Sequence, residues 1–329
     1  MYRNNAVMKG LVSMYIGIDL GGTNIAVGIV DENGKILVKG STPTLSIRSY
    51  REIVKDMVDL SHELLEKANL SVADIKAVGV GSPGSIDSKN GVVVYSCNLG
   101  FNNAPLREEL QKYFDVPVAV ENDANAAALG EYKATNIDAE CFVAITLGTG
   151  VGGGIIINGK IFSGFNGIAG ELGHTTLVAD GVQCPCGKKG CWEAYASVTA
   201  LIRQTKVAIE KHPESLMADI AKKSNNEVNG RTAFDAAKQG DKAAQEVVNK
   251  YVRYVADGVT DVINIFQPEI LVIGGGISRE GEYLVEPVRK YVDEFGYAKN
   301  GIPKAKIQAA TLLNDAGIVG AAFAAKELI

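Results

Sequence analysis

Residues 15–30 read Tyr15-Ile-Gly-Ile-Asp-Leu-Gly-Gly-Thr-Asn-Ile-Ala-Val-Gly-Ile-Val30, and an Asn33-Gly34 pair follows. Two apolar runs flank a glycine-rich stretch, which predicts two strands joined by a tight loop. Asn-Gly between apolar runs is the strongest short-range signal for a β-hairpin, so a third strand is expected after Gly34. We therefore expect a set of hairpins over residues 14–40.

A second copy of this pattern reads Phe142-Val-Ala-Ile-Thr-Leu-Gly-Thr-Gly-Val-Gly-Gly-Gly-Ile-Ile-Ile157, followed by Asn158-Gly159. Aligning Leu20 with Leu147 places Gly21 on Gly148, and the Asn-Gly pairs then fall within two residues of register. Two such loops facing each other would offer backbone N–H groups to a polyphosphate from both sides. The repeat suggests a two-lobed phosphotransferase, although glycine-rich hairpins are common and so few identities can arise by chance.

Length and composition describe an ordinary globular protein. The 329 residues suffice for about two domains, and 47% of them are hydrophobic and 22% charged. The net charge of −5 without a Lys/Arg cluster argues against nucleic acid or an anionic membrane as the main partner. Residues 1–13 lack the pattern of a secretory signal, so we expect a cytoplasmic protein with this leader outside the fold.

Strand-rich and helix-containing stretches alternate along the chain, which predicts an α/β class with mixed sheets. Further strands are expected at 75–80, 91–95, 116–120, 269–273 and 306–311, and the second set of hairpins is expected at 141–162. Helices are expected at 48–68, 107–114, 124–133, 281–295 and 315–328, with a mostly helical stretch from 194 to 256.

The pattern G-x-G-x-x-G occurs at Gly79-Gly81-Gly84 and at Gly148-Gly150-Gly153. A dinucleotide-binding site requires a helix to begin at such a loop. Turn-forming residues follow Gly84, and a strand followed by a hairpin turn follows Gly153, so we reject that interpretation. The P-loop pattern G-x-x-x-x-G-K-[ST] is absent from the sequence.

One His and three Cys lie within eighteen residues: His174, Cys184, Cys186 and Cys191. This is the ligand set of a closed tetrahedral zinc site. Because four protein ligands leave no open coordination position, the zinc ion is expected to be structural and to hold a loop in place. The alternative is that the cysteines are unligated thiols.

Taken together, the motifs resemble those of the ROK sugar kinases, which include bacterial glucokinases, fructokinases and N-acetylmannosamine kinases. The matching motifs, in the family's order, are Asp19-Leu-Gly-Gly-Thr-Asn24, Gly81-Ser-Pro-Gly84, Asn98-Leu-Gly-Phe101, Glu121-Asn-Asp123, Leu147-Gly-Thr-Gly-Val-Gly-Gly-Gly154, Gly170-Glu-Leu-Gly-His174, Cys184-x-Cys-Gly-x-x-Gly-Cys-x-Glu193, Gly274-Gly-Gly276 and Asp315-Ala-Gly-Ile-Val-Gly320. Phe101 stands where many members have Trp.

The resemblance implies an actin-like, hexokinase-like (ribonuclease H-like) two-domain fold with an interdomain cleft and a structural zinc loop. We expect residues 14–122 plus 312–329 to form the smaller domain and residues 123–311 the larger one. The implied activity is ATP-dependent phosphorylation of a hexose, with glucose to glucose 6-phosphate as the expected reaction. The resemblance also implies a homodimer or homotetramer.

The resemblance implies that Asp123 is the general base, which accepts the proton of the attacking hydroxyl. For this role its carboxylate must lie within hydrogen-bond reach of that hydroxyl. The alternative is that Asp123 only caps the Ala-rich helix that follows it. The implied sugar-contacting residues are Gly81, Ser82, Asn98, Asn122, Asp123, Glu171, His174 and Glu193. Glu171 and Glu193 can instead be solvated loop carboxylates.

The implied nucleotide-binding residues are Gly21, Gly22, Thr23, Gly148, Thr149, Gly150, Gly274, Gly275 and Gly276, with Asp19 holding Mg²⁺ directly or through water. The alternatives are a turn-forming role for Asp19 and a plain strand-to-loop turn at 274–276. The cofactors implied are thus ATP, Mg²⁺ and structural Zn²⁺.

Two other function classes compete with the kinase. A sugar-responsive repressor of the same family would carry an additional N-terminal helix-turn-helix, and only fourteen residues precede the first expected strand. A non-catalytic sugar-binding or zinc scaffold protein is disfavoured by Asp123 and by the two glycine loops. Among kinases, fructose, mannose, allose and N-acetylmannosamine remain alternatives to glucose, and polyphosphate or another nucleotide remains an alternative donor.

Overall fold

A computed structural model describes residues 13–329, which form two compact units. The first unit consists of residues up to 138, 154–170 and 314–329, and the second of residues 139–153 and 171–313. The leader that we expected at residues 1–13 lies, but for Ser13, outside the described residues.

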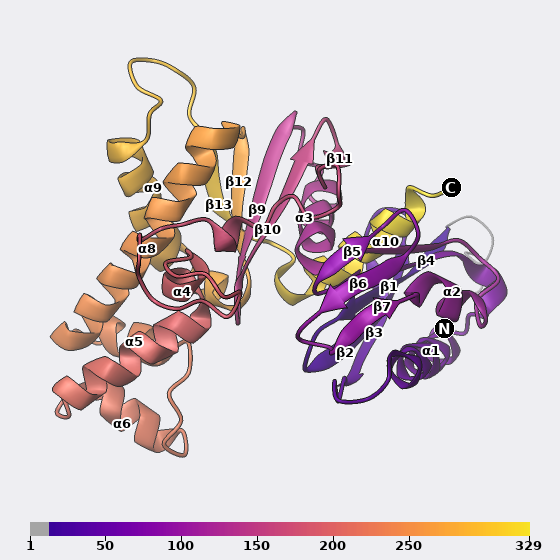
Figure 1. Cartoon of the computed structure of the whole chain (residues 1–329), viewed down its shortest axis with the longest axis horizontal. Helices are drawn as coiled ribbons and strands as arrows, with labels where there is room; N and C mark the ends of the chain where they lie inside the picture. The colour runs from indigo at the N-terminus through magenta and orange to yellow at the C-terminus, as the bar shows by residue number, and fades with distance from the viewer. Residues whose placement is uncertain (1–12) are drawn as a thin grey trace, which may run out of the picture. The chain divides into compact units, whose positions relative to one another are not determined.

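The first unit is built on a five-stranded sheet of order β3-β2-β1-β4-β8 (Figure 1). Its strands are β1 (Met14–Leu20), β2 (Asn24–Asp31), β3 (Ile36–Pro43), β4 (Ile75–Ser82) and β8 (Val118–Asn122). β1, β2 and β3 form an antiparallel meander, as the hairpin signals predicted, whereas β1, β4 and β8 are parallel. The carboxyl ends of these three strands therefore lie at one edge of the sheet.

A small antiparallel sheet belongs to the same unit. It consists of β5 (Ser85–Asp87), β6 (Val92–Ser96) and β7 (Phe101–Ala104). The short helix α2 (Leu106–Gln111) follows it.

Helices pack against the main sheet of the first unit. α1 (Tyr50–Lys67) begins at a capping box of Ser49 and Glu52 and buries a stripe of apolar residues against β2 and β3. α10 (Ala316–Lys326) packs against β1 and β4, although it comes from the other end of the chain (Figure 1). A Cβ at Gly79 would overlap the Ala321 carbonyl oxygen, so the absence of a side chain lets α10 lie directly on the sheet.

The helix α3 (Asp123–Ala134) groups with the first unit, whereas we expected it to begin the larger domain. The reason is its tight packing on α10: a Cβ at Gly320 would overlap the Ala126 carbonyl oxygen. Small residues on both helices permit this close approach. α3 is therefore attached to the same unit as the strand that precedes it.

A second five-stranded sheet has the order β11-β10-β9-β12-β13. Its strands are β9 (Cys141–Leu147), β10 (Val151–Ile157), β11 (Lys160–Ile161), β12 (Ile270–Gly274) and β13 (Lys306–Ala309). β12 pairs in parallel with both β9 and β13. β10 follows β9 through the second glycine loop, so the strand pattern of the sequence repeat is confirmed.

Helices make up most of the rest of the second unit (Figure 1). They are α4 (Glu193–Ala196), α5 (Val198–Lys211), α6 (Leu216–Lys223), α7 (Thr232–Lys238), α8 (Lys242–Phe266) and α9 (Glu282–Phe295). The mixed α/β class is confirmed. Both G-x-G-x-x-G loops lead into strands, β5 and β10, which is inconsistent with dinucleotide binding. Within residues 13–329, no helix combines the length and hydropathy needed to cross a bilayer.

Candidate active site

The candidate residues fall into two groups, one in each unit. The first group lies at the carboxyl ends of β1, β4 and β8. Asp19 is paired with Gly81 across β1 and β4, and Ser82 is paired with Asn122 across β4 and β8. A Cβ at Gly81 would lie 3.1 Å from the Ala126 Cβ and 3.6 Å from the Cα of Asp123, so the end of β4 lies close to the first turn of α3.

The Gly21–Thr23 loop between β1 and β2 is held by Thr44, a fully buried residue after β3. The Thr44 hydroxyl donates to the Gly21 carbonyl oxygen at 2.6 Å, and its N–H donates to the Thr23 carbonyl oxygen at 2.8 Å. A Cβ at Gly22 would lie 3.4 Å from the Cβ of the exposed Asn98. The structure thus brings Asn98 next to the expected phosphate loop.

The cap of α3 is Asn122, so the alternative role of Asp123 as the cap is wrong. Asn122 Oδ1 accepts hydrogen bonds from the N–H groups of Ala124 and Asn125, at 2.9 and 3.2 Å. Asp123 is the first residue of the helix, and its Oδ1 accepts from the Ala124 N–H at 2.8 Å. The partial positive charge at a helix N-terminus favours an ionised carboxylate there.

Glu121 is a buried carboxylate that sequence reasoning did not place in the site. Its Oε1 accepts from the Asn122 N–H at 2.8 Å and from Asn125 Nδ2 at 3.0 Å. Its Oε2 accepts from the Ser88 hydroxyl at 3.0 Å. These bonds tie the end of β8 to the first turn of α3 and so fix the backbone on either side of Asp123.

Burial raises the pKa of Asp19 from its usual 3.8 to about 6, and the neighbouring Asp123 carboxylate contributes to the increase. Two carboxylates at one strand edge are both fully ionised only at an electrostatic cost. A cation between phosphate oxygens and one or two carboxylates is the usual Mg²⁺ environment in proteins. The donor set therefore fits a Mg²⁺–nucleotide complex.

We predict that Asp19→Asn stabilises the nucleotide-free protein at pH 7 by up to about 3 kcal/mol, at about 1.36 kcal/mol per pKa unit. Below about pH 4 the carboxyl is protonated in both the folded and the unfolded chain, so Asp19 does not lower the stability of the wild type there. As the pH rises from about 4 to about 6, ionisation of this carboxyl increasingly favours the unfolded chain, and above about pH 6 the loss of stability is constant. Urea denaturation at pH 4 and pH 7 measures the difference, and a variant less stable than wild type at pH 7 contradicts the prediction.

The second group begins with two glycine loops at the ends of the paired strands β9 and β12, where Gly274 pairs with Thr146. Gly275 has a φ of +83°, and a Cβ there would overlap the carbonyl oxygen of Leu147, the residue before Gly148. Both the positive φ and the close carbonyl oxygen therefore require glycine at position 275. The structure thus brings the expected phosphate loop 148–150 next to the expected nucleotide-binding loop 274–276.

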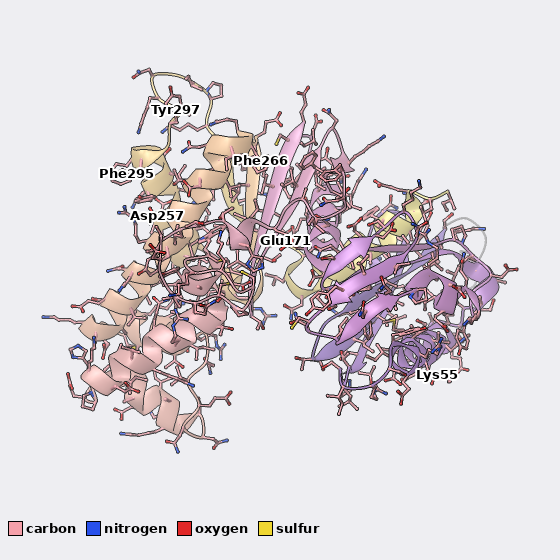
Figure 2. The ribbon with its side chains drawn as sticks, viewed as in Figure 1. Lys55, Glu171, Asp257, Phe266, Phe295 and Tyr297 are labelled. Atoms are coloured by element: carbon pink, nitrogen blue, oxygen red, sulfur yellow. The ribbon has the colours of Figure 1, made fainter. Side chains whose placement is uncertain are left out.

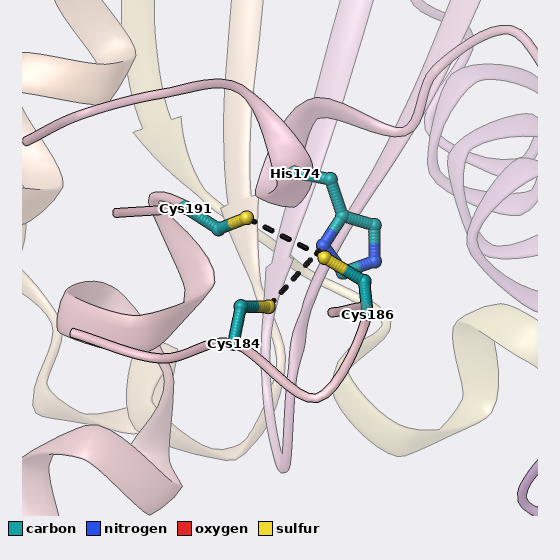
Figure 3. A group of neighbouring side chains, drawn as sticks. All are labelled: His174, Cys184, Cys186 and Cys191. Carbon is teal, nitrogen blue, oxygen red and sulfur yellow. Dashed lines mark hydrogen bonds between the residues drawn. The ribbon is translucent and has the colours of Figure 1, made fainter. Parts of the chain in front are cut away.

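The four expected metal ligands converge in the same unit (Figure 3). Their donor atoms all lie within 4.8 Å of one another, with Cys184 Sγ 3.7 Å from His174 Nδ1 and Cys186 Sγ 3.6 Å from Cys191 Sγ. A tetrahedron with metal–sulfur bonds of about 2.3 Å has edges of about 3.8 Å. Cys184 and Cys191 are buried and Cys186 is exposed. The donor set and its spacing fit a closed Zn²⁺ site.

Two carboxylates lie beside this cluster: Glu171 next to His174, and Glu193 next to Cys184. Glu171, labelled in Figure 2, has an exposed side chain, and its Oε2 lies 3.9 Å from His174 Nε2, the ring nitrogen that faces away from the cysteines. Glu193 is partly buried at the start of α4, and its Oε2 accepts from the Val151 N–H at 2.9 Å. Glu171 is thus a solvent-facing carboxylate, whereas Glu193 is engaged with the backbone of β10.

Known proteins match this chain along nearly its whole length. The signature of the ROK family matches residues 15–328. A glucokinase of Thermotoga maritima is 41% identical over 316 residues, which cover 95% of this chain and 98% of that protein. A xylose repressor of Caldicellulosiruptor bescii is 30% identical over 315 residues, covering 94% of this chain and 77% of that protein.

A solved structure agrees with the expected fold. It is a ROK family glucokinase from Streptomyces griseus in complex with glucose and AMPPNP, which matches with a TM-score of 0.84 at 37% identity and covers 95% of this chain and 99% of its own. A ROK hexokinase from Thermus thermophilus also matches, with a TM-score of 0.74 at 31% identity, and covers 96% of this chain and 98% of its own. These two likenesses confirm the expected actin-like, hexokinase-like fold class. The chain belongs to the ROK family.

Proposed function

We propose that this protein is an ATP-dependent hexose kinase that converts glucose to glucose 6-phosphate. The observation that carries the proposal is the cluster at the ends of β1, β4 and β8, where Asp19, the Gly21–Thr23 loop and Asp123 lie in one unit. Phosphoryl transfer needs a positioned acceptor and stabilised phosphate charge. The glucokinase relatives of this family support the same conclusion.

Asp123 is the general base in this proposal. Its carboxylate takes the proton of the sugar hydroxyl while that oxygen forms a bond to the γ-phosphorus of ATP and the bond from phosphorus to the leaving ADP oxygen breaks. The hydrogen bond from Ala124 and the capped helix end hold the carboxylate in one orientation. Such a base contributes about 10²–10⁴ to the rate.

The backbone N–H groups of the two glycine loops bind the phosphates, and the 274–276 loop accommodates the adenosine. Asp19 is the residue of this chain that would hold Mg²⁺. The ion, when bound, neutralises phosphate charge. Asn98, Asn122, Glu171, His174 and Glu193, with Gly81 and Ser82, form the sugar-binding set, in which amides and carboxylates match hydroxyls that both donate and accept.

The Cys3His group holds a structural zinc ion in this proposal, and His174 then links the ion to the sugar site. Its Nδ1 faces the cysteines, so Nε2 is available to donate to a sugar hydroxyl or to Glu171. The protein is expected to act as a homodimer or homotetramer, which multi-angle light scattering measures.

A coupled assay of ADP formation with a panel of sugars tests the substrate. We expect glucose to give the highest kcat/KM among glucose, fructose, mannose, allose and N-acetylmannosamine. If another sugar gives a higher kcat/KM, that sugar replaces glucose as the proposed substrate, and the proposal of a sugar kinase still holds. If no sugar supports turnover although glucose binds by calorimetry, the kinase proposal fails and a sugar sensor, as in the repressor relatives, takes its place.

A further inference from the structure

Val151, the first residue of β10 after the Gly148–Gly150 loop, is contacted from two sides by the Cys3His loop. We call residues 171–175 the histidine arm and residues 191–199 the cysteine arm. We propose that a metal ion in the Cys3His group, by joining the two arms, sets the conformation of the Gly148–Gly150 loop and thereby couples metal occupancy to nucleotide binding. This inference rests on the proposed function, because it takes the loop to bind phosphates.

The histidine arm meets Val151 through backbone packing. Gly173 lies directly before the ligand His174, in the short helix η2 (Leu172–His174). A Cβ at Gly173 would overlap the Val151 carbonyl oxygen and lie 2.9 Å from the Val151 Cβ. The backbone of the arm is therefore in direct contact with Val151, one residue away from a metal ligand.

The cysteine arm meets Val151 through a side chain. Glu193 lies two residues after the ligand Cys191, and its Oε2 accepts the 2.9 Å hydrogen bond from the Val151 N–H. Its Oε1 lies 3.8 Å from Sγ of the ligand Cys184. A Cβ at Gly150 would overlap Glu193 Oε2, so this carboxylate also lies against the loop itself.

The rest of the cysteine arm binds the other two loop residues. The Val198 N–H donates to the Gly148 carbonyl oxygen at 2.8 Å, and the Thr199 hydroxyl donates to the Thr149 carbonyl oxygen at 2.8 Å. Each residue of the 148–150 loop is therefore contacted by the segment that begins at a metal ligand.

Trp192 makes the cysteine arm a rigid connection. It is fully buried, and its Nε1 donates to the Tyr254 carbonyl oxygen at 2.8 Å. Its backbone N–H donates to the Thr175 carbonyl oxygen at 2.9 Å, which joins the cysteine arm to the histidine arm next to His174. Cys191 is therefore joined to Glu193 through a single residue whose side chain and backbone are both held.

Coupling follows from these contacts. With metal bound, the arms hold the loop N–H groups in a single arrangement before nucleotide arrives. Without metal, the arms are less constrained and nucleotide must order the loop as it binds, which lowers its affinity. Coupling between two binding events is reciprocal, so nucleotide must raise metal affinity by the same factor. Glu193 is the positioning residue that carries most of this effect.

The test measures AMPPNP affinity by calorimetry on zinc-loaded and zinc-stripped protein, with zinc content and circular dichroism measured on each sample. We expect stripping to weaken AMPPNP binding by at least about fivefold, the lower end of usual coupling. We also expect AMPPNP to slow zinc release to a chromogenic chelator. Equal AMPPNP affinity in folded samples with and without zinc overturns the inference.

Variants kept in the zinc-loaded form test the role of Glu193 even if the stripped protein unfolds. Glu193→Ala removes the acceptor of the Val151 N–H and should weaken AMPPNP binding by at least about fivefold, whereas Glu193→Gln keeps an acceptor oxygen and should restore most of it. Glu210→Ala is the matched control, because it makes the same substitution at an exposed carboxylate of the same unit that lies outside both arms. Equal AMPPNP affinity in zinc-loaded wild type and Glu193→Ala overturns the inference.

The inference and the proposed function fail in different ways. If wild-type protein phosphorylates glucose and AMPPNP affinity is independent of zinc and of Glu193, the inference alone is wrong. If zinc-loaded wild type neither binds AMPPNP nor phosphorylates any sugar, both are wrong.

Discussion

Asp123→Asn is expected to lower kcat for ATP-dependent glucose phosphorylation by at least about a hundredfold, the lower end for loss of a general base. The asparagine side chain has the same shape, and its Oδ1 can still accept the 2.8 Å hydrogen bond from the Ala124 N–H. The fold and the capped start of α3 should therefore persist. What the variant loses is the ability to take a proton from the sugar hydroxyl.

The measurement is steady-state ADP formation with glucose, together with AMPPNP affinity by calorimetry, which should change by less than about threefold. Asp115→Asn is the matched control, because it makes the same substitution at an exposed residue of the same unit. If Asp123→Asn keeps kcat within about tenfold of wild type, Asp123 is not the general base.

Cys191→Ser is expected to abolish zinc binding and to destabilise the protein by more than about 4 kcal/mol, a size that single substitutions reach only by mechanisms such as loss of a metal. Cys191 is fully buried, and a serine hydroxyl is a poor ligand for zinc. The new hydroxyl is also left in a site shaped for a thiolate. Activity should fall with the metal, because Glu171, His174 and Glu193 lie on the same loop.

Zinc content by elemental analysis and thermal unfolding measure this effect. Cys97→Ser is the matched control, since it makes the same change at an exposed cysteine outside the cluster. We expect Cys97→Ser to retain about one zinc ion per chain, as wild type should for a closed four-ligand site. A Cys191→Ser protein that keeps its zinc and its melting temperature contradicts a structural metal site.

Local patterns were sufficient to predict much of the fold. The apolar runs around Gly21 and Gly148 and the Asn-Gly pairs predicted both hairpin sets, because strand alternation and turn chemistry act over a few residues. The Cys3His group was equally predictable, since its ligands lie within eighteen residues and each type has a specific affinity for zinc.

Contacts between distant parts of the chain were not predictable in this way. The grouping of α3 with the first unit depends on glycine packing between Gly320 and Ala126, which no local signal reports. The bond from Val151 to Glu193 spans 42 residues, and nothing in either motif indicates it. The cap at Asn122 was missed because Asn122 and Asp123 are both good caps, and only the backbone geometry distinguishes them.

The most direct test of the central claim is product analysis after incubating the purified protein with Mg²⁺, ATP and glucose. Phosphorus and proton NMR identify which sugar oxygen carries the phosphoryl group. We predict glucose-dependent formation of ADP and glucose 6-phosphate in equal amounts. ADP formation that is independent of sugar, or no product although both glucose and AMPPNP bind, would contradict the account.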